Sequence, residues 1–322
     1  MNRRCRGIWR RHICGLQDGY FIVAESGRDG AELMSKFRSC RSFFQKALVL
    51  FRFPGKWHHF VHYLATKLLV GNGVARIPQR GRIRTSTFSE YLAVYGLLPG
   101  RGEQNLMRKR LAHAHNVFDV GANVGVWTVL MSKSNPSARI HSFEPNGATF
   151  NLLEVNVKEN SCGNVTLINA AASDREGTIL FQVPPNASIF GRILPTEQPI
   201  DKDARFLNAR ASQVLRLRLA DYCRQAGVAE IDFMKMDIEG HELAALRGLE
   251  PLLSERRVRS LYVETIETNH TRAGSSFSAF VRFVNDCGYE LWTINEQGEP
   301  DSPVHLNTIK AHNHLCLPTG CD

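Results

Sequence analysis

An apolar run, Val-Phe-Asp-Val, leads into the turn Gly-Ala-Asn-Val-Gly at residues 117–125, and Phe-Glu-Pro-Asn follows at residues 143–146. A buried strand, a glycine turn that opens a helix, and a second strand ending in a carboxylate are typical of a nucleotide-type cofactor pocket. Gly121 and Gly125 are spaced as G-x-x-x-G, without the glycine that lets a backbone approach a pyrophosphate. The spacing therefore favours a ligand with a ribose but no phosphates, and S-adenosylmethionine fits that description.

Each residue of these motifs has an expected role. Asp119 ends the first strand and is expected to take the ligand's ammonium, directly or through water. A helix predicted to begin at Asn123 offers free N–H groups and a positive dipole end to a ligand carboxylate. Glu144 ends the next strand, where an acid can accept both ribose hydroxyls. Ser173 or Asp174, after the third strand, is a candidate for the adenine amine, with an ordinary loop as an equally weighted alternative.

Residues 235–242 read Lys-Met-Asp-Ile-Glu-Gly-His-Glu and form a second polar cluster. Carboxylates and a histidine at a switch from strand to helix are not a core pattern. A glutamate at a helix start is stabilising by itself, so Glu242 is interpreted as a cap. Asp237 and Glu239 are interpreted as functional. Glu264 ends the following strand and is expected at the same edge of the sheet.

Alternating apolar runs and helical patterns indicate a doubly wound α/β domain that positions these residues. The predicted strands are 116–120, 139–143, 164–169, 178–183, 214–219, 231–236, 260–264, 289–294 and 312–317. The predicted helices are 57–69, 103–114, 123–134, 147–159, 220–226, 240–253 and 276–286. The proline-containing loop 184–213 is a candidate lid or substrate loop.

The order of these motifs resembles the FkbM family of S-adenosylmethionine-dependent methyltransferases, over roughly residues 117–265. The resemblance rests on Asp-Val-Gly-Ala-Asn-Val-Gly, Phe-Glu-Pro-Asn, Asn-Ala-Ala-Ala-Ser-Asp, Lys-Met-Asp-Ile-Glu-Gly-His-Glu, Leu-Arg-Gly and Tyr-Val-Glu. It implies the class I, Rossmann-like fold: a seven-stranded, mostly parallel sheet of order 3-2-1-4-5-7-6, with strand seven antiparallel and helices on both faces. It also implies O-methylation, usually of a sugar, glycolipid or small-metabolite hydroxyl.

Methyl transfer to a neutral hydroxyl needs a base. The candidates are Asp237, Glu239, His241, Glu264 and His270. A histidine near its ordinary pKa suits proton removal at neutral pH, although a helix-surface position is the somewhat favoured interpretation of His241. Asp237, Glu239 and Glu264 could instead hold a divalent cation that lowers the pKa of the hydroxyl. Three oxygen ligands are an incomplete Mg²⁺ set, so the cation is not favoured.

The positive charge is concentrated in residues 1–115, which have a net charge of +15, whereas residues 116–322 have a net charge of −6. We expect a basic, poorly ordered arm over 1–56, a helical lead-in over 57–115, and the methyltransferase domain over 116–322. An open alternative is RNA methylation guided by the basic third. The absence of a basic stripe interleaved with aromatics makes a nucleic-acid partner unfavoured.

Two further interpretations would change the class of protein. A membrane-surface binding module is suggested by the apolar face of residues 57–69, flanked by basic residues that suit anionic lipid. Packing of this helix on the catalytic domain is the favoured interpretation. An NAD-dependent oxidoreductase is disfavoured by the missing central glycine and by Asn123 in the turn.

The eight cysteines are scattered without a C-x-x-C pair, which predicts reduced thiols in a cytoplasmic protein. The apolar runs near the N-terminus are too short to cross a membrane, and no signal-peptide core is visible. Contact with the inner membrane face through the basic region is compatible with this location. Residues 1–33 lack periodicity and Met34 opens a more protein-like stretch, so a start at Met34 is an open alternative to a genuine N-terminal arm.

Overall fold

The computed structural model describes residues 74–79, 81–85, 94, 96–183, 191–194, 209–304 and 313–320. All of them belong to one compact unit, Val70–Asp322. The predicted basic arm, the 57–69 helix and most of the 184–213 loop lie outside the described residues, so those predictions stay predictions.

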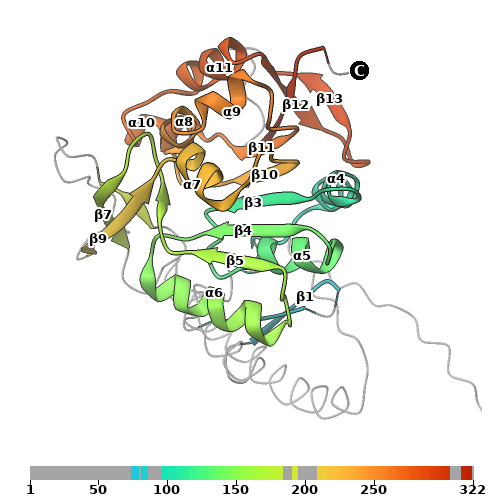
Figure 1. The fold of residues 1–322 in the computed structure, drawn as a ribbon, viewed down its shortest axis with the longest axis vertical. Helices are drawn as coiled ribbons and strands as arrows, with labels where there is room; N and C mark the ends of the chain where they lie inside the picture. Colours follow the sequence, from blue (N-terminus) through green and yellow to red (C-terminus); the bar gives the residue numbers. More distant parts are fainter. Residues whose placement is uncertain are drawn as a thin grey trace, which may run out of the picture. The chain divides into compact units, whose positions relative to one another are not determined.

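A central sheet of eight strands organises the described residues, and its middle can be followed from β5 to β11 in Figure 1. Five parallel strands are β5 (Val165–Ile168), β4 (Arg139–Phe143), β3 (Asn116–Val120), β10 (Phe233–Met236) and β11 (Leu261–Glu264). Antiparallel strands β14 (Asn313–Pro318), β12 (Tyr289–Ile294) and β13 (Pro300–Pro303) complete the sheet in that order.

This order confirms the predicted 3-2-1-4-5-7-6 arrangement, with β14 as the antiparallel seventh strand inserted between β11 and β12. The predicted count of seven strands is wrong by one. The chain turns back after β12, and β13 pairs along its outer edge. The Pro residues at both ends of β13 suit an edge strand, because proline cannot donate to a central ladder.

Apolar side chains cover both faces of the sheet, as the near-continuous hydrophobic strands require. On β3, Val117 belongs to one buried cluster, and Phe118 and Val120 belong to the other. The first cluster contains residues of β1 (Val74–Ile77), β2 (Gly81–Arg84), α4 (Arg101–Leu111), α5 (Val126–Ser134) and α6 (Gly147–Glu159). The second contains residues of α7 (Leu219–Ala226), α8 (Glu242–Arg247), α9 (Glu250–Ser254) and α11 (Phe277–Asp286).

A smaller sheet of order β6-β9-β7-β8 stands on the left in Figure 1. Its strands are β6 (Ala171–Ala172), β7 (Gly177–Val183), β8 (Arg192–Ile193) and β9 (Arg210–Leu217). The strand predicted over 214–219 is therefore wrong at both ends. Pairing with β7 extends it back to Arg210, and Leu219 already begins α7.

Two helix predictions need correction. The single helix predicted over 240–253 is two helices, α8 and α9. A Cβ on Gly248 would overlap the carbonyl oxygen of Ser173, and Pro251 lies in the first turn of a new helix that begins at Glu250, where its missing N–H is not needed. The helix predicted from Asn123 begins at Val126, because Gly125 caps it in the left-handed conformation. The additional helix α10 (Glu267–Arg272) follows β11.

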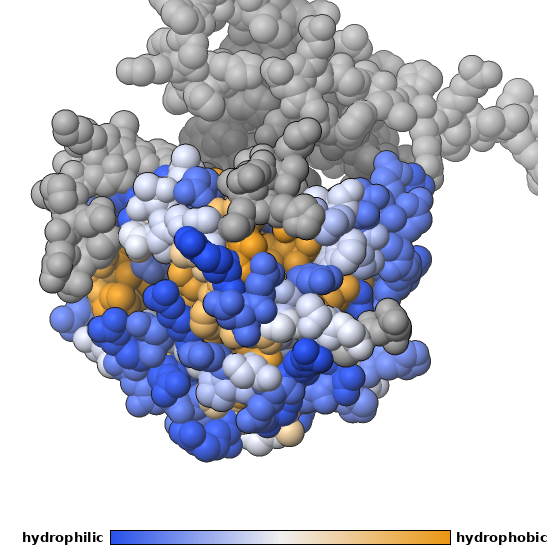
Figure 2. All heavy atoms as spheres, turned by 90° about the horizontal axis from the view of Figure 1, so that it is seen from above, coloured by the Kyte–Doolittle hydropathy of each residue, from blue (hydrophilic) through white to orange (hydrophobic). Residues whose placement is uncertain are grey.

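The visible surface of the described residues is mainly hydrophilic, with hydrophobic areas in its central part (Figure 2). Large exposed hydrophobic residues in the described ranges are Val155, Leu180 and Leu215. None of the described helices is long and apolar enough to cross a bilayer. The described cysteines are free thiols, and all of them are buried: Cys162, Cys223, Cys287 and Cys316.

Candidate active site

A row of polar side chains crosses the otherwise apolar sheet on the face that carries α4 and α5. Asp119 on β3, Lys235 on β10 and Tyr262 on β11 are register partners on neighbouring strands. Their sequence neighbours Phe118, Met234 and Val263 belong to the buried cluster on the opposite face. Strand alternation therefore brings these three polar groups to the same place, near the carboxyl ends of the parallel strands.

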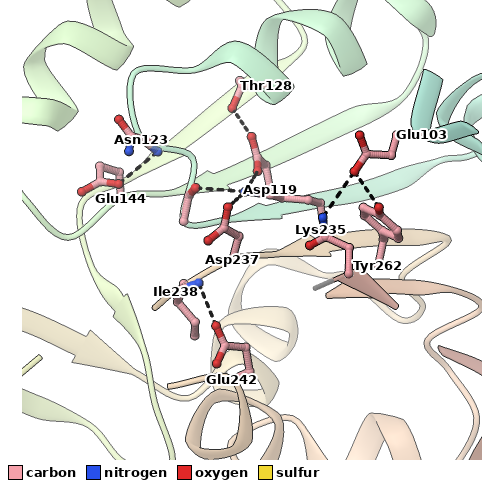
Figure 3. Close-up of polar contacts among 12 residues, drawn as sticks. Glu103, Asp119, Asn123, Thr128, Glu144, Lys235, Asp237, Ile238, Glu242 and Tyr262 are labelled. Carbon is pink, nitrogen blue, oxygen red and sulfur yellow. Dashed lines mark hydrogen bonds and ion pairs between the residues drawn. The ribbon is translucent and has the colours of Figure 1, made fainter. Parts of the chain in front are cut away.

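Lys235 is the centre of this row (Figure 3). Its Nζ lies 3.3 Å from Asp237 Oδ2 and 3.9 Å from Asp119 Oδ1, and donates a 3.4 Å hydrogen bond to the Gly121 carbonyl. Burial alone would lower the pKa of Lys235, but Asp237 and Asp119 raise it above its ordinary value. The ammonium therefore stays charged and joins the glycine loop to the end of β10.

Asp119 is fully buried, and its Oδ2 accepts a 2.6 Å hydrogen bond from the Thr128 hydroxyl. Burial raises its pKa, while Lys235 and Thr128 oppose that shift. The fully buried side chain exposes no oxygen to which a ligand could bind directly. Of the two routes predicted for Asp119, the indirect one is compatible with this geometry.

The glycine loop requires its glycines. Gly121 has a φ of 82°, and a Cβ there would overlap the backbone carbonyl oxygen of Asp237. Gly125 has a φ of 94°, and a Cβ there would lie 2.6 Å from Leu153 Cδ1. Both residues occupy the left-handed region that disfavours other residue types. The loop thus runs close to β10 and α6 while leaving the first N–H groups of α5 at its end.

Glu144 follows β4 and lies beside this loop (Figure 3). Its Oε2 accepts a 3.0 Å hydrogen bond from the Asn123 N–H, and its Oε1 accepts a 2.9 Å bond from the Asn146 N–H. Burial raises the pKa of Glu144 to about 7, although these two bonds oppose the shift. Asn169, which sequence reasoning missed, donates a 2.7 Å hydrogen bond to the Glu144 carbonyl and fixes the end of β5 beside it.

Ser173 and Asp174 directly follow β6 of the smaller sheet. The Ser173 N–H donates to the Leu217 carbonyl, and its hydroxyl donates to Asp174 Oδ1 at 3.2 Å. The Arg175 guanidinium binds both carboxylate oxygens of Asp174 and lowers its pKa. Hydrogen bonds of the Ser173 and Asp174 side chains thus connect them to each other and to Arg175. Their predicted role in binding the adenine amine stays a prediction.

The turn after β10 separates the predicted functional acids. Glu242 Oε1 accepts hydrogen bonds from the N–H groups of Ile238 (3.0 Å) and Gly240 (3.2 Å), which lie in the turn before α8, so Glu242 closes this turn and does not cap the helix. Glu239 has a φ of 57°, and its Oε2 accepts a 3.1 Å bond from the Asn269 amide. Asp237 pairs with Lys235. These three neighbouring carboxyl groups therefore have three different sets of contacts.

The two histidine candidates are poor bases in this structure. Burial lowers the pKa of His241 to about 4, although a hydrogen bond with the backbone of Ile193 opposes the shift. His270 is completely buried, with its Nδ1 3.2 Å from the Ser275 hydroxyl, and burial lowers its pKa. Both rings are therefore neutral near pH 7.

A cavity of about 160 Å³ opens beside the polar row, and its lining includes Glu103, Trp127, Lys235, Asp237, Tyr262 and Glu264. Of the four predicted catalytic residues, the structure brings Asp237 and Glu264 together there, whereas Glu239 and His241 are not part of its wall. Burial, followed by Asp237, Glu239 and Glu242, raises the pKa of Glu264 to about 9.

Glu103, Trp127 and Tyr262 are site residues that sequence reasoning missed. The Tyr262 hydroxyl donates a 2.6 Å hydrogen bond to Glu103 Oε1 (Figure 3), and its ring stacks with Trp127. Tyr262 lies directly before Val263 and Glu264 in the recognised Tyr-Val-Glu motif, which is the signal that could have identified it. Glu103 is separated from Tyr262 by 159 positions and gives no comparable signal.

Within the described ranges, no group of three or more His, Cys, Asp or Glu residues is arranged to hold a metal ion. The oxygen ligands considered from the sequence were Asp237, Glu239 and Glu264. Of these, Asp237 pairs with Lys235, and Glu239 accepts a hydrogen bond from Asn269.

Residues 119–291, more than half of the chain, match the family model described as the methyltransferase FkbM domain. Methyltransferase sdnD of Sordaria araneosa is 27% identical over 206 residues, which cover 58% of this chain and 77% of that protein. Hexuronic acid methyltransferase AglP of Haloferax volcanii is 29% identical over 153 residues, 46% of this chain and 57% of its own.

The 31-O-demethyl-FK506 methyltransferase FkbM of Streptomyces tacrolimicus is 27% identical over 155 residues, 42% of this chain and 59% of its own. The chain thus spans less than two thirds of the length of these last two relatives. A solved O-methyltransferase of Bacillus cereus in complex with SAH covers 71% of this chain and 85% of its own, with 8% identity and a TM-score of 0.36. A likeness at that level carries no argument about the site.

Proposed function

Because the chain belongs to the FkbM family of methyltransferases, we propose that it transfers a methyl group from S-adenosylmethionine to a hydroxyl of a sugar, glycolipid or small metabolite. The names of two relatives specify a hexuronic acid and 31-O-demethyl-FK506 as their substrates, which supports an oxygen acceptor of this kind. The observation that carries the proposal is the placement of Glu144 against the glycine loop.

The residues at this edge of the sheet fit the methyl donor. Glu144 has both carboxylate oxygens fixed by backbone N–H groups, and each oxygen keeps a lone pair for a ribose hydroxyl. The N-terminus of α5 follows Gly125 and suits the donor's carboxylate. Asp119 contributes indirectly: it pairs with Lys235, and the Lys235 ammonium donates a hydrogen bond that holds the Gly121 carbonyl in place. The donor, when bound, supplies an already activated methyl group.

What remains for the protein is alignment and proton removal. The α4 and α5 side of the sheet excludes water by packing Trp127 and Tyr262 over the ends of β10 and β11. Positioning of the acceptor hydroxyl against the methyl group converts a bimolecular reaction into an effectively unimolecular one. A carboxyl group at this edge then takes the hydroxyl proton.

Calorimetric titration with S-adenosylhomocysteine tests the donor site. In Glu144→Gln, the amide NH₂ would face a backbone N–H donor, so the loop shifts and we expect affinity to fall at least roughly 10-fold. Glu154→Gln, on the exposed face of α6, is the matched control and should bind like the wild type. Equal affinity in Glu144→Gln and the wild type would remove Glu144 from the donor site.

A further inference from the structure

The cavity beside the polar row is smaller than a whole donor molecule. Its volume is about 160 Å³. Pockets that enclose drug-sized ligands are typically ~300 Å³ or more. The cavity therefore has room for one ring-sized group or a short chain segment at the ends of β10 and β11.

Two aromatic rings form one side of this cavity. Trp127 on α5 and Tyr262 on β11 stack with their ring centroids 6.0 Å apart and an interplanar angle of 30°. Tyr262 is held by Glu103 of α4, which also accepts a 2.6 Å hydrogen bond from the Gly100 N–H at the start of that helix. The rings therefore present fixed apolar surface, which suits the C–H face of a ring.

The three carboxyl groups of the cavity wall differ in whether they have hydrogen-bond or ion-pair partners. Glu103 accepts from Tyr262 and Gly100, and Asp237 pairs with Lys235. Glu264 has no side-chain hydrogen bond or ion pair with any residue in the described part of the chain. Glu264 is thus the wall carboxyl whose oxygens are free to meet a ligand.

The cavity also lacks a spare positive charge among its described lining residues. Lys235 supplies the ammonium group of the wall, and that group already lies between Asp119 and Asp237. A carboxylate or phosphate entering the cavity would meet Glu264 without a cation to pair with it, which is costly in a poorly solvated site. An uncharged hydroxyl has no such penalty.

Resting on the proposed function, we propose that this cavity is the acceptor site, that it takes an uncharged ring bearing the hydroxyl, and that Glu264 is the base for that hydroxyl. In the transfer, the O–H bond of the acceptor breaks and its proton goes to a Glu264 carboxylate oxygen. A bond between the acceptor oxygen and the methyl carbon forms as the carbon–sulfur bond breaks. Sulfur keeps the electron pair of that bond and becomes a neutral thioether.

The charged groups around Glu264 make its protonation state depend on binding of the methyl donor. Lys235 and Asp237 come from β10, Glu239 and Glu242 from the turn after it, Glu103 from α4, and the register partner Asn313 from β14. Burial raises the pKa of Glu264 to about 9, and the carboxylates of Asp237, Glu239 and Glu242 add to this shift more than the single ammonium of Lys235 opposes it. A cationic sulfonium beside Glu264 favours its charged form, so donor binding produces the base.

Proton release measured by calorimetry tests this link without knowledge of the acceptor. Cationic S-adenosylmethionine and neutral-sulfur S-adenosylhomocysteine are titrated at about pH 7.5 in two buffers of different ionisation enthalpy. We expect the wild type to release up to about one more proton with the sulfonium ligand, and Glu264→Gln to lose that difference. Glu290→Gln, an exposed acid on β12, should retain it.

The outcomes separate the two proposals. A Glu264→Gln variant that still releases the additional proton would overturn the role of Glu264. A wild-type protein that binds neither ligand would overturn the proposed function itself.

Transfer of labelled methyl into an extract of the native host provides the catalytic readout. Glu264→Gln should lower the turnover rate roughly 100- to 10,000-fold and remove the rising limb of its pH profile, with affinity for S-adenosylhomocysteine unchanged within about 2-fold. Undiminished labelling by Glu264→Gln would contradict the assignment. A labelled product with an acidic group next to the methylated oxygen would contradict the charge selection.

Discussion

The proposed donor and acceptor sides of the site hold their carboxyl groups in different ways. On the donor side, both oxygens of Glu144 accept backbone N–H groups, from Asn123 and Asn146. On the acceptor side, Tyr262 is fixed by the side chain of Glu103, 159 positions away, and the side chain of Glu264 has no hydrogen-bonding partner in the described ranges. The first arrangement depends on loop backbone, and the second depends on individual side chains.

This difference determines how strongly substitutions change the geometry of each side. A loop held by backbone contacts keeps its geometry unless a glycine or the carboxylate itself is replaced. A cavity wall built from side chains of α4, α5, β10 and β11 changes with any single substitution. Such a division suits an enzyme whose donor is constant and whose acceptor can differ between relatives. Lys235 joins the two sides, because it contacts both Asp119 and Asp237.

Lys235→Met should have the largest effect on stability, because it breaks this junction. Removal of the ammonium leaves Asp119 and Asp237 next to one another without a cation, and the free energy of unfolding should fall by about 3–5 kcal/mol. Urea denaturation measures the change. Lys158→Met, on the exposed face of α6, should stay within about 0.5 kcal/mol of the wild type.

A double variant distinguishes the loss of the ion pair between Lys235 and Asp119 from the loss of packing around the Lys235 side chain. Adding Asp119→Asn to Lys235→Met removes one of the uncompensated charges, so part of the lost stability should return. Equal stability of the single and double variants would show that the ion pair is not what joins the two sides.

Gly121→Ala should have the next largest effect, and it changes the glycine loop of the proposed donor side. The new Cβ would overlap the Asp237 carbonyl oxygen at a backbone φ of 82°, which should lower the free energy of unfolding by roughly 2–4 kcal/mol. S-adenosylhomocysteine binding should weaken with it. Gly163→Ala is the matched control, because nothing lies within 4 Å of its added Cβ. A comparable loss in both variants would contradict the close approach at Gly121.

The difference between local backbone contacts and contacts of distant side chains also explains which parts of the site could be predicted from the sequence. Strands β3 and β4 and helix α6 have the predicted bounds, because their apolar periods and their caps are local. The donor motif is contiguous, so the position of Glu144 beside the glycine loop could be predicted from its spacing alone. The cap predicted at Glu242 was less accurate, because its carboxylate binds N–H groups of the turn before α8.

The acceptor side could not be predicted from local patterns. The contact between Glu103 and Tyr262 depends on α4 packing across β11, and no spacing in the sequence indicates it. Asp237 and Glu239 are two positions apart, yet the left-handed turn at Glu239 directs one to Lys235 and the other to Asn269. Burial, which made His241 a weak base, is likewise a tertiary property.

Tyr262→Phe should have a moderate effect confined to the acceptor side. The variant keeps the ring against Trp127 and removes the hydrogen bond to Glu103, so we expect a loss of about 1–2 kcal/mol in unfolding free energy. S-adenosylhomocysteine affinity should change by less than about 2-fold, since Glu144 and its loop are untouched. A large loss of donor affinity in Tyr262→Phe would show that the two sides are not separate.

The smallest expected effect is a pH dependence of stability that distinguishes the sides. The pKa of Glu144 is about 7 and that of Glu264 about 9, both raised from 4.5 by burial. Between the unfolded and folded pKa values, the folded protein holds a proton that the unfolded chain has lost. The stability that each neutral carboxyl contributes is therefore complete below about pH 4.5 and disappears as the pH rises through its folded pKa.

Thermal unfolding of the ligand-free protein from about pH 5 to pH 9 tests this in wild type and Glu264→Gln. The amide of the variant cannot ionise, so the variant should lose less stability at high pH, by an amount on the order of 1 kcal/mol, because solvent screening reduces the effect of a partly exposed group. The step near pH 7 from Glu144 should be the same in both proteins. If the two profiles were parallel up to about pH 9, Glu264 would not be the acceptor-side carboxyl that holds a proton, since its replacement would then change nothing that titrates.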